Sequence, residues 1–75
     1  MNNEWYEVCE FHKKFGHPVS DFPVKMEADR ALKRYHWLLE EVNEFIEADE
    51  IVEQADAMID VIYFALGTLV EMGIK

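Results

Sequence analysis

The stretch from Glu40 to Asp60 constrains the fold of this chain more than any other. It carries nine Asp or Glu residues and no Lys or Arg, yet most of its other residues are Val, Phe, Ile, Ala and Met. Proteins usually bury these apolar residues, so packing them brings like charges together. Either the carboxylates form a solvated face, or a positive group from outside the stretch lies among them.

A chain of 75 residues forms one domain with a small core. Ordering it costs on the order of 100 kcal/mol of conformational entropy, so such a domain usually depends on disulfides, a metal or a partner chain. The chain has a single cysteine, Cys9, so it cannot form an internal disulfide. This predicts a cytoplasmic protein, and we expect the Cys9 side chain to pack in the core. Because 51% of the residues are apolar, we expect a homodimer or higher homo-oligomer.

The net charge of −9 argues against a nucleic-acid polymer as partner, since such binding needs a basic patch. We expect no membrane partner, because the longest uncharged apolar run, residues 61–70, is too short to cross a bilayer. We expect no secretory signal, because the first residues lack a basic segment followed by an apolar one. Six of the seven Lys and Arg residues lie between Lys13 and Arg34. This distribution fits a site that holds both an anion and a cation, and it fits pairing between chains equally well.

We predict three helices and no strands. The first helix runs from about Asn3, a suitable N-cap, to Phe15, and Gly16 ends it. The segment that follows is rich in residues that interrupt regular structure, with Pro18 and Pro23 after the glycine. It should therefore be an irregular connection between the first helix and the second.

The second and third helices are predicted to form a hairpin. The second runs from about Lys25 to Glu47, and the third starts after Asp49, a suitable N-cap, and ends near Met72, where Gly73 follows. Because the connection between them is very short, the two helices should lie antiparallel. The expected fold class is all-α: an antiparallel helical hairpin plus an N-terminal helix, completed into a helical bundle by oligomerisation.

Side-chain spacing divides the second helix into two faces. At about 100° per residue, six apolar side chains fall within one arc that we expect to face the core: Tyr35, Leu38, Leu39, Val42, Phe45 and Ile46. A neighbouring stripe is basic at its N-terminal end and acidic at its C-terminal end, and its members are Arg30, Arg34, Trp37, Glu41 and Glu44. Glu40 points further from the core than Glu41 does.

The third helix carries a single acidic stripe. Glu53, Asp56 and Asp60 are separated by three and four residues, so they share an arc of about 60°. Almost every other residue up to Val70 is apolar or small, which is typical of a buried helix. The stripe should therefore face a cavity or another helix rather than bulk solvent.

Carboxylates brought together in this way favour a bound cation. Burying a carboxylate costs several kcal/mol, and neighbouring like charges raise one another's pKa values. Mg²⁺ and Mn²⁺ prefer carboxylate oxygens, and acidic pairs on facing helices build metal sites in helical bundles. We therefore predict a Mg²⁺ site, with Mn²⁺ as an alternative, whose candidate ligands are Glu41, Glu44, Glu53, Asp56 and Asp60.

The same acids belong to a longer pattern. "EEVNE" at residues 40–44, followed by "EQAD" at 53–56, resembles the E-E-x-x-E … E-x-x-D signature of the all-α nucleoside triphosphate pyrophosphohydrolases. That superfamily includes MazG proteins, dimeric dUTPases and phosphoribosyl-ATP pyrophosphohydrolases. The flanking stretches "EFHKKFGHPV" and "DAMIDVIYFALGTLVEMGI" resemble the phosphoribosyl-ATP pyrophosphohydrolase-like branch. Together these stretches indicate a single MazG-like helical domain over residues 1–75.

The resemblance implies a Mg²⁺-dependent enzyme that hydrolyses the α–β phosphoanhydride of a nucleotide to a nucleoside monophosphate and pyrophosphate. It matches four side chains to the metal ligands: Glu41, Glu44, Glu53 and Asp56. Glu40 matches the first Glu of the signature and is the candidate catalytic residue that orients or deprotonates the attacking water, with a solvated surface position as the alternative. Asp60, one turn beyond Asp56, is an additional ligand or an acceptor behind the ligands.

The candidate residues for substrate binding are inferred from helix geometry and not from the family resemblance. Arg30 and Arg34 share the stripe of Glu41, so they are placed to hold the phosphates furthest from the metal. Ion pairs of these arginines with Glu27, Asp29 or a partner chain are an equal alternative.

Aromatic and histidine side chains complete the candidates. Trp37 is placed to stack on a base, with a packing role as the alternative; Tyr63 and Phe64 are expected to pack. Three side chains of the first helix are placed to close the site: Phe11, Lys13 and Lys14. The histidines lack the spacing of a zinc site and are expected in surface or capping roles: His12, His17 and His36.

Two departures from the family pattern leave alternatives open. The spacer between Glu44 and Glu53 is shorter than relatives usually have, and relatives generally continue beyond the third helix into a further helix that contacts the nucleotide. The chain is then a minimal enzyme completed by dimerisation, a piece of a longer protein, or a member that binds metal without turnover. The rival function is a non-catalytic metal-binding or assembly module, and the base, sugar and phosphate number of a substrate stay open.

Overall fold

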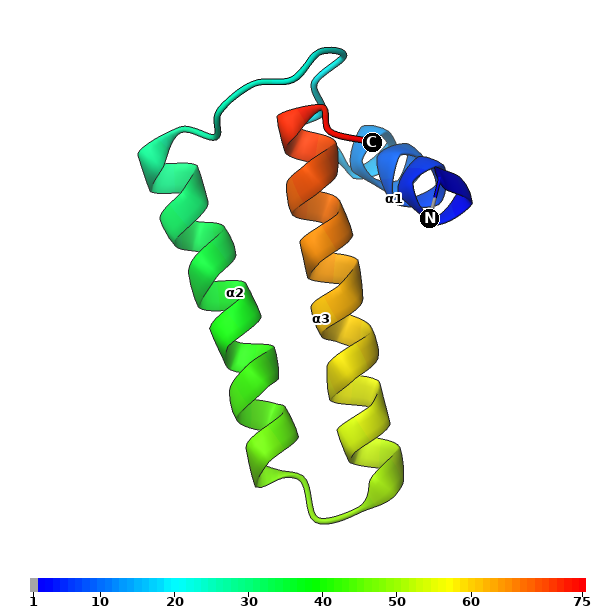
Figure 1. Ribbon diagram of the computed structural model, residues 1–75, viewed down its shortest axis with the longest axis vertical. Helices are drawn as coiled ribbons and strands as arrows, with labels where there is room; N and C mark the ends of the chain where they lie inside the picture. The colour runs from blue at the N-terminus through cyan, green and yellow to red at the C-terminus, as the bar shows by residue number, and fades with distance from the viewer. Residues whose placement is uncertain (1) are drawn as a thin grey trace.

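The computed structural model describes residues 2–75, which form three α-helices and no strand (Figure 1). Helix α1 spans Asn2–Phe15, α2 spans Ala28–Glu47 and α3 spans Ile51–Met72. Helices α2 and α3 run side by side in opposite directions and are joined by residues 48–50. The predicted all-α class and the antiparallel hairpin are confirmed.

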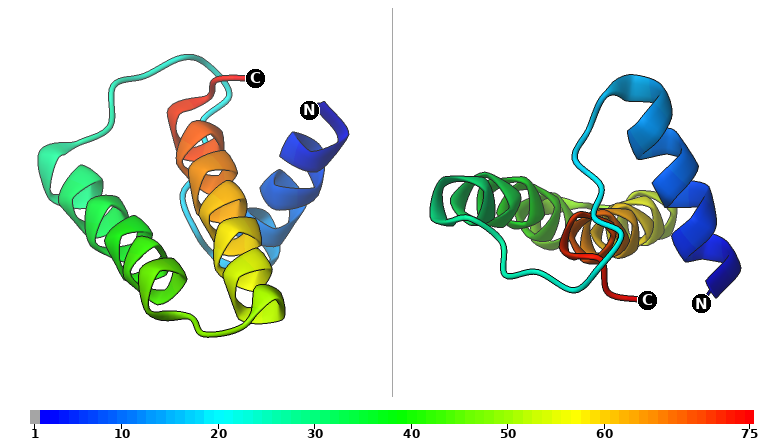
Figure 2. Two further views of the ribbon diagram at one scale, coloured as in Figure 1. Left: turned by 60° about the horizontal axis from the view of Figure 1, so that its bottom comes forward. Right: turned by 90° about the horizontal axis from the view of Figure 1, so that it is seen from above.

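Helix α3 lies between the other two helices (Figure 2). Helix α2 packs along one side of it, and α1 crosses the other side. The small core lies in the second contact, where Trp5, Val8 and Cys9 of α1 meet Leu66 and Val70 of α3. The predicted packing role of Cys9 is confirmed, because its side chain is buried in this core.

The predicted starts of the helices need correction. Helix α1 begins one residue earlier than expected, whereas α2 begins at Ala28 rather than Lys25. The side chain of Glu27 caps α2, because its carboxylate accepts hydrogen bonds from the backbone N–H groups of Asp29 and Arg30 at 3.1 and 3.3 Å. In α3 the N-cap is Glu50 rather than the predicted Asp49.

The irregular segment between α1 and α2 is attached to the C-terminal end of α3. The backbone N–H groups of Ser20 and Val24 donate to the carbonyls of Val70 and Met72 at 3.3 and 2.9 Å. The segment therefore runs over the end of α3, and this attachment explains why α2 starts later than local sequence signals predict.

Gly16 and Gly73 follow α1 and α3 with positive φ angles of 75° and 69°, as predicted for residues that end helices. The surroundings of the two glycines differ. A Cβ at Gly73 would lie 2.2 Å from the carbonyl oxygen of Phe22 in the attached segment, whereas a Cβ at Gly16 would meet open space.

The predicted core face of α2 is wrong for the single chain. Four of its six apolar side chains are exposed, with exposed fractions from 39 to 75%: Tyr35, Leu39, Val42 and Ile46. The prediction of a buried α3 is also wrong, since Ile51 and Ile62 are 80 and 58% exposed. Helical spacing correctly finds the apolar faces, but α3 alone covers only one side of α2 and two helices cover only two sides of α3. No helix in the described part of the chain has the length and apolar character needed to cross a membrane.

Candidate metal centre

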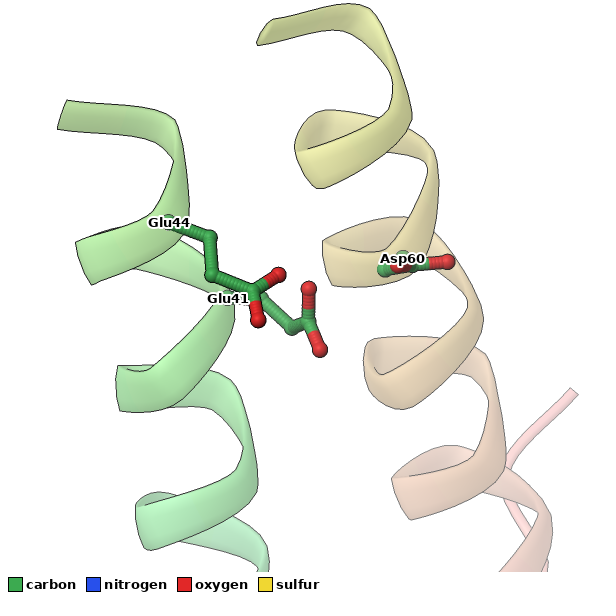
Figure 3. A group of neighbouring side chains, drawn as sticks. All are labelled: Glu41, Glu44 and Asp60. Carbon is green, nitrogen blue, oxygen red and sulfur yellow. The ribbon is translucent and has the colours of Figure 1, made fainter. Parts of the chain in front are cut away.

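Three carboxylates converge between the two helices of the hairpin (Figure 3). Glu41 and Glu44 project from one face of α2, because residues three apart lie about one helical turn from each other. Asp60 occupies the facing position on α3. One oxygen from each carboxylate lies within 4.8 Å of the others. We call Glu41, Glu44 and Asp60 the acidic group.

Glu41 is the least solvated member of the acidic group. Its Oε2 atom is buried and has no hydrogen-bond partner among the described residues. The pKa of its carboxyl group is raised from 4.5 to about 7; burial is the largest cause, and the neighbouring Glu44 and Asp60 add to the rise. In the absence of a cation, the neutral and the ionised forms of Glu41 are therefore about equally populated near pH 7.

A cavity of about 410 Å³ adjoins the acidic group and contains the other two predicted ligands. Glu53 and Asp56 line this cavity together with Glu44 and Asp60, and the remaining lining residues are Glu47, Ala48 and Ala57. Glu53 and Asp56 are exposed and do not belong to the acidic group itself. The structure thus brings three of the five predicted ligands together and places the other two along the adjoining cavity.

Glu40 lies apart from these residues. Its side chain is exposed on α2, outside the acidic group and outside the lining of the cavity. The predicted role of Glu40 as a base therefore has no contact in this chain to support it.

The donor set fits a hard divalent cation. Carboxylate oxygens are the ligands that Mg²⁺ and Mn²⁺ prefer. A bound cation would give the buried Oε2 of Glu41 the partner that the described protein atoms do not supply. It would also offset the repulsion among the three carboxylates. Among the described residues, no Lys or Arg side chain forms an ion pair with any of the three.

The two arginines of the α2 stripe bind Glu71 near the end of α3. The Nε and Nη2 atoms of Arg30 donate to its two carboxylate oxygens at 2.8 Å each, and Arg34 donates from Nε at 3.0 Å and from Nη2. Burial alone would raise the pKa of Glu71, but the hydrogen bonds from Arg30 and Arg34 outweigh it and lower the pKa.

Sequence reasoning considered Glu27, Asp29 and a partner chain for these arginines and missed Glu71. The antiparallel register could have found it, because the start of α2 necessarily lies opposite the end of α3. Arg34 is only 5% exposed. Most of its guanidinium surface is therefore in contact with other protein atoms.

Trp37 packs over the arginines. The guanidinium carbons of Arg30 and Arg34 each lie 5.1 Å from the centre of its ring system, within the range of cation–π attraction. Its ring centre also lies 5.9 Å from that of Phe64 on α3. Trp37 thus packs within the hairpin and also lines a second cavity.

The second cavity, which we call the aromatic cavity, measures about 570 Å³ and lies between α1 and the hairpin. Its lining comprises Glu7, Val8, Phe11, His12, His17, Arg34, Trp37, Asp60, Tyr63 and Phe64. Of the α1 residues placed to close the site, Phe11 belongs to this lining, whereas Lys13 and Lys14 are exposed outside it. Asp60 lines both cavities, so each of them adjoins the acidic group.

The predicted surface or capping role of His12 is wrong. Its side chain is only 4% exposed, and its Nδ1 atom lies 2.9 Å from the carbonyl oxygen of Pro18. Sequence reasoning could not foresee this burial, because it depends on how α1 and the segment after it pack on α3.

The family model described as phosphoribosyl-ATP pyrophosphohydrolase matches residues 8–75. The chain belongs to this family. None of the curated proteins compared with the chain matches it. The match includes all of α2 and α3 and therefore every member of the acidic group.

Membership in the phosphoribosyl-ATP pyrophosphohydrolase family confirms the resemblance seen in the sequence motifs. It places the chain in the all-α nucleoside triphosphate pyrophosphohydrolase superfamily and implies a nucleotide pyrophosphohydrolase acting on a nucleotide substrate. The acidic group could bind the metal ion on which such enzymes depend.

Proposed function

We propose that this protein is a Mg²⁺-dependent nucleotide pyrophosphohydrolase that cleaves an NTP or a related nucleotide to a nucleoside monophosphate and pyrophosphate. The observation that carries the proposal is the convergence of Glu41, Glu44 and Asp60, with a buried and unpartnered oxygen on Glu41. Family membership supports the class of reaction.

The acidic group would hold the cation, with Glu53 and Asp56 on the side of the adjoining cavity. When bound, Mg²⁺ would polarise a phosphoryl oxygen, neutralise developing charge and lower the pKa of a bound water. Water then forms a bond to phosphorus while the bridging α–β P–O bond breaks and pyrophosphate leaves. We assign the proton of that water to the carboxylate of Glu40, which must reach the reaction from the exposed side of α2.

Arg30 is the better candidate of the two arginines for the phosphates. Its side chain is 22% exposed, against 6% for Arg34, whereas both guanidinium groups lie equally close to Trp37. Mn²⁺ offers the same preference for oxygen ligands and is the expected substitute for Mg²⁺.

We further propose that the protein works as a homodimer or higher homo-oligomer. The exposed apolar side chains on α2, at Leu32, Tyr35, Leu39, Val42 and Ile46, recur every three or four residues and form one continuous stripe. A stripe of this kind is typical of a helix that packs against another helix. A second copy would cover the face that α3 leaves open.

The direct test is to incubate the purified protein with Mg²⁺ and a panel of nucleotides and to resolve the products. Nucleoside monophosphate plus pyrophosphate is expected, with activity lost in Glu41→Gln and Asp56→Asn and retained in Glu10→Gln, an exposed acid of α1 outside both cavities. Nucleoside diphosphate plus orthophosphate would contradict the proposed bond cleavage.

The exposed apolar stripe also favours a second function, a non-catalytic metal-binding or assembly module. Stabilisation by Mg²⁺ without turnover of any nucleotide would support that function instead.

A further inference from the structure

His12 occupies an enclosed position that all three helices form. It belongs to α1, its side chain is only 4% exposed, and its Nε2 atom lies 3.5 Å from Nη2 of Arg34 on α2. Gly67 of α3 provides the space, because a Cβ there would lie 3.0 Å from Nε2 of His12 and 3.0 Å from Nη1 of Arg34. That is closer than ordinary van der Waals contact. The imidazole therefore has little room to move away from the guanidinium while α1 stays packed.

The hydrogen bonds of His12 require a neutral imidazole. The carbonyl oxygen of Pro18 can only accept, so Nδ1 carries the proton that is donated at 2.9 Å. Nε2 then holds the lone pair that accepts the hydrogen bond from Nη2 of Arg34. Both ring nitrogens thus have a partner. A second proton, on Nε2, would point at a guanidinium, which can only donate.

The surroundings of His12 disfavour its charged form. Burial is the largest influence on the pKa of the imidazole and lowers it, and the net pKa lies below the ordinary value of 6.5. Two acids, Glu7 and Asp60, also line the cavity beside the ring. The other groups that act on this pKa, in order of decreasing effect, are the Pro18 carbonyl, which raises it, Arg34, which lowers it, Glu71, which raises it, and His17, which lowers it.

The contacts within the hairpin do not depend on a neutral histidine. Helices α2 and α3 are joined by the ion pairs of Arg30 and Arg34 with Glu71. Burial alone would raise the pKa of Glu71, but the hydrogen bonds from the two arginines lower it below 4.5, so the carboxylate stays ionised at pH 5.5. Helix α1, by contrast, is held by the small core that it forms with α3 and by the hydrogen bond between His12 and Arg34 (Figure 2).

We propose that His12 is a pH-sensitive contact that keeps α1 packed against the hairpin at neutral pH and releases it in acid. A proton on Nε2 removes the acceptor for Arg34 and places two positive groups side by side in a buried position. Release of α1 opens the aromatic cavity, which lies between α1 and the hairpin, and exposes the small core. Neither a metal nor a nucleotide is needed for this response, so it is independent of the proposed function.

The packed position of α1 is most stable above pH 6.5. In the released state the imidazole is exposed and takes its ordinary pKa of about 6.5, whereas in the packed state the pKa is lower. As the pH falls through 6.5, the released state therefore binds the proton more readily and becomes more populated. One such proton changes the equilibrium between the two states by at most about tenfold between pH 7.5 and pH 5.5.

The single cysteine of the chain can report the release of α1. Cys9 lies one turn before His12, and its side chain is 6% exposed in the core between α1 and α3. Its reaction with 4,4′-dithiodipyridine, which labels thiols in acid as well, is measured at pH 7.5 and pH 5.5 with EDTA present. Each rate is divided by the rate of the guanidinium-unfolded protein at the same pH, which removes the intrinsic reactivity of the thiol. The protection of Cys9 should decrease about five- to tenfold at pH 5.5.

His12→Asn separates this contact from a general effect of acid. Asparagine keeps a donor for the Pro18 carbonyl and takes up no proton, so the protection of Cys9 should be equal at the two pH values within about twofold. The matched control replaces the other two histidines, as His17→Asn together with His36→Asn, and should retain the full decrease. Hydrogen exchange, corrected for the intrinsic rate at each pH, should show that the loss of protection at pH 5.5 is confined to α1.

A measurement that leaves His12 in place covers the case in which His12→Asn does not fold. In the protein with His17→Asn and His36→Asn, the imidazole signals in the NMR spectrum belong to His12. They should show a neutral ring protonated at Nδ1 at pH 7.5. An imidazole that titrates at or above pH 6.5, a retained decrease of Cys9 protection in folded His12→Asn, or its loss in the double variant would overturn the proposal. An equal loss of exchange protection in all three helices would overturn it as well, because it would indicate global unfolding.

Discussion

Replacing Glu41 by glutamine should stabilise the metal-free protein above pH 7. The pKa of this carboxyl group is about 7 in the folded protein, against 4.5 as its ordinary value, because burial and then Glu44 and Asp60 disfavour its charge. Between these pH values the folded state binds more protons than the unfolded state, so the free energy of unfolding falls as the pH rises. The contribution of Glu41 is therefore fully present below about pH 4.5 and lost above about pH 7. Glutamine does not ionise and avoids that loss.

The size of the effect follows from the same pKa. At about 1.4 kcal/mol per pH unit, the rise from 4.5 to about 7 corresponds to roughly 3 kcal/mol as an upper limit. The Glu41 side chain is partly exposed, so solvent screening reduces the expected gain to about 1 kcal/mol. In a domain of this size a gain of 1 kcal/mol raises the melting temperature by about 4–8 °C.

The assay is thermal unfolding followed by circular dichroism in the presence of EDTA, at pH 5 and at pH 8. Glu41→Gln should melt several degrees above the unaltered protein at pH 8 and close to it at pH 5. Glu40→Gln, which removes an exposed acid outside the acidic group, should show no such pH-dependent difference. Adding Mg²⁺ at pH 8 should stabilise the unaltered protein and not Glu41→Gln. A lower melting temperature for Glu41→Gln at pH 8, or an equal change at both pH values, would refute the reasoning.

Other perturbations separate the remaining interactions. Gly73→Ala should lower the free energy of unfolding by well over about 1 kcal/mol, because the new Cβ clashes with the Phe22 carbonyl and the backbone is also strained. Gly16→Ala causes the backbone strain alone and should cost about 1 kcal/mol. Chemical denaturation compares the two variants, and equal losses would contradict the contact between position 73 and the Phe22 carbonyl. Glu71→Ala leaves two guanidinium groups without their partner and should cost about 3–5 kcal/mol in the same experiment. Leu39→Lys should shift the mass measured by light scattering toward the monomer, and an unchanged oligomer would rule out the α2 stripe as its interface.

Local sequence signals predicted the hairpin well. Helical spacing and the short connection predicted that acidic side chains of α2 and α3 face each other. They paired Glu41 and Glu44 with Glu53 and Asp56, however, and gave Asp60, which lies with them in the structure, only as an additional ligand or an acceptor behind the ligands. The same signals could not separate ligands that converge from those that line the neighbouring cavity, since Glu53 and Asp56 share the stripe of Asp60. That distinction depends on the distance between the helix axes along their length, which periodicity does not encode.

The incorrect predictions have a common physical cause. The late start of α2 and the burial of His12 both depend on the segment after α1 crossing the end of α3. The ion pairs of Arg34 with Glu71 depend on the same tertiary arrangement. Periodicity likewise shows which side of a helix is apolar, but not which neighbour covers it, so the exposed stripe on α2 was predicted as core.

The hairpin is held unevenly along its length. At the end formed by the start of α2 and the end of α3, two guanidinium groups bind the Glu71 carboxylate. Toward the turn, the three carboxylates of the acidic group repel one another. The free energy of local opening should therefore decrease from the first end toward the turn, and amide hydrogen exchange should be fastest around residues 41–60 when no cation is bound. If the acidic group holds a divalent ion as proposed, binding of that ion would slow the opening of this half of the hairpin and leave the other half unchanged.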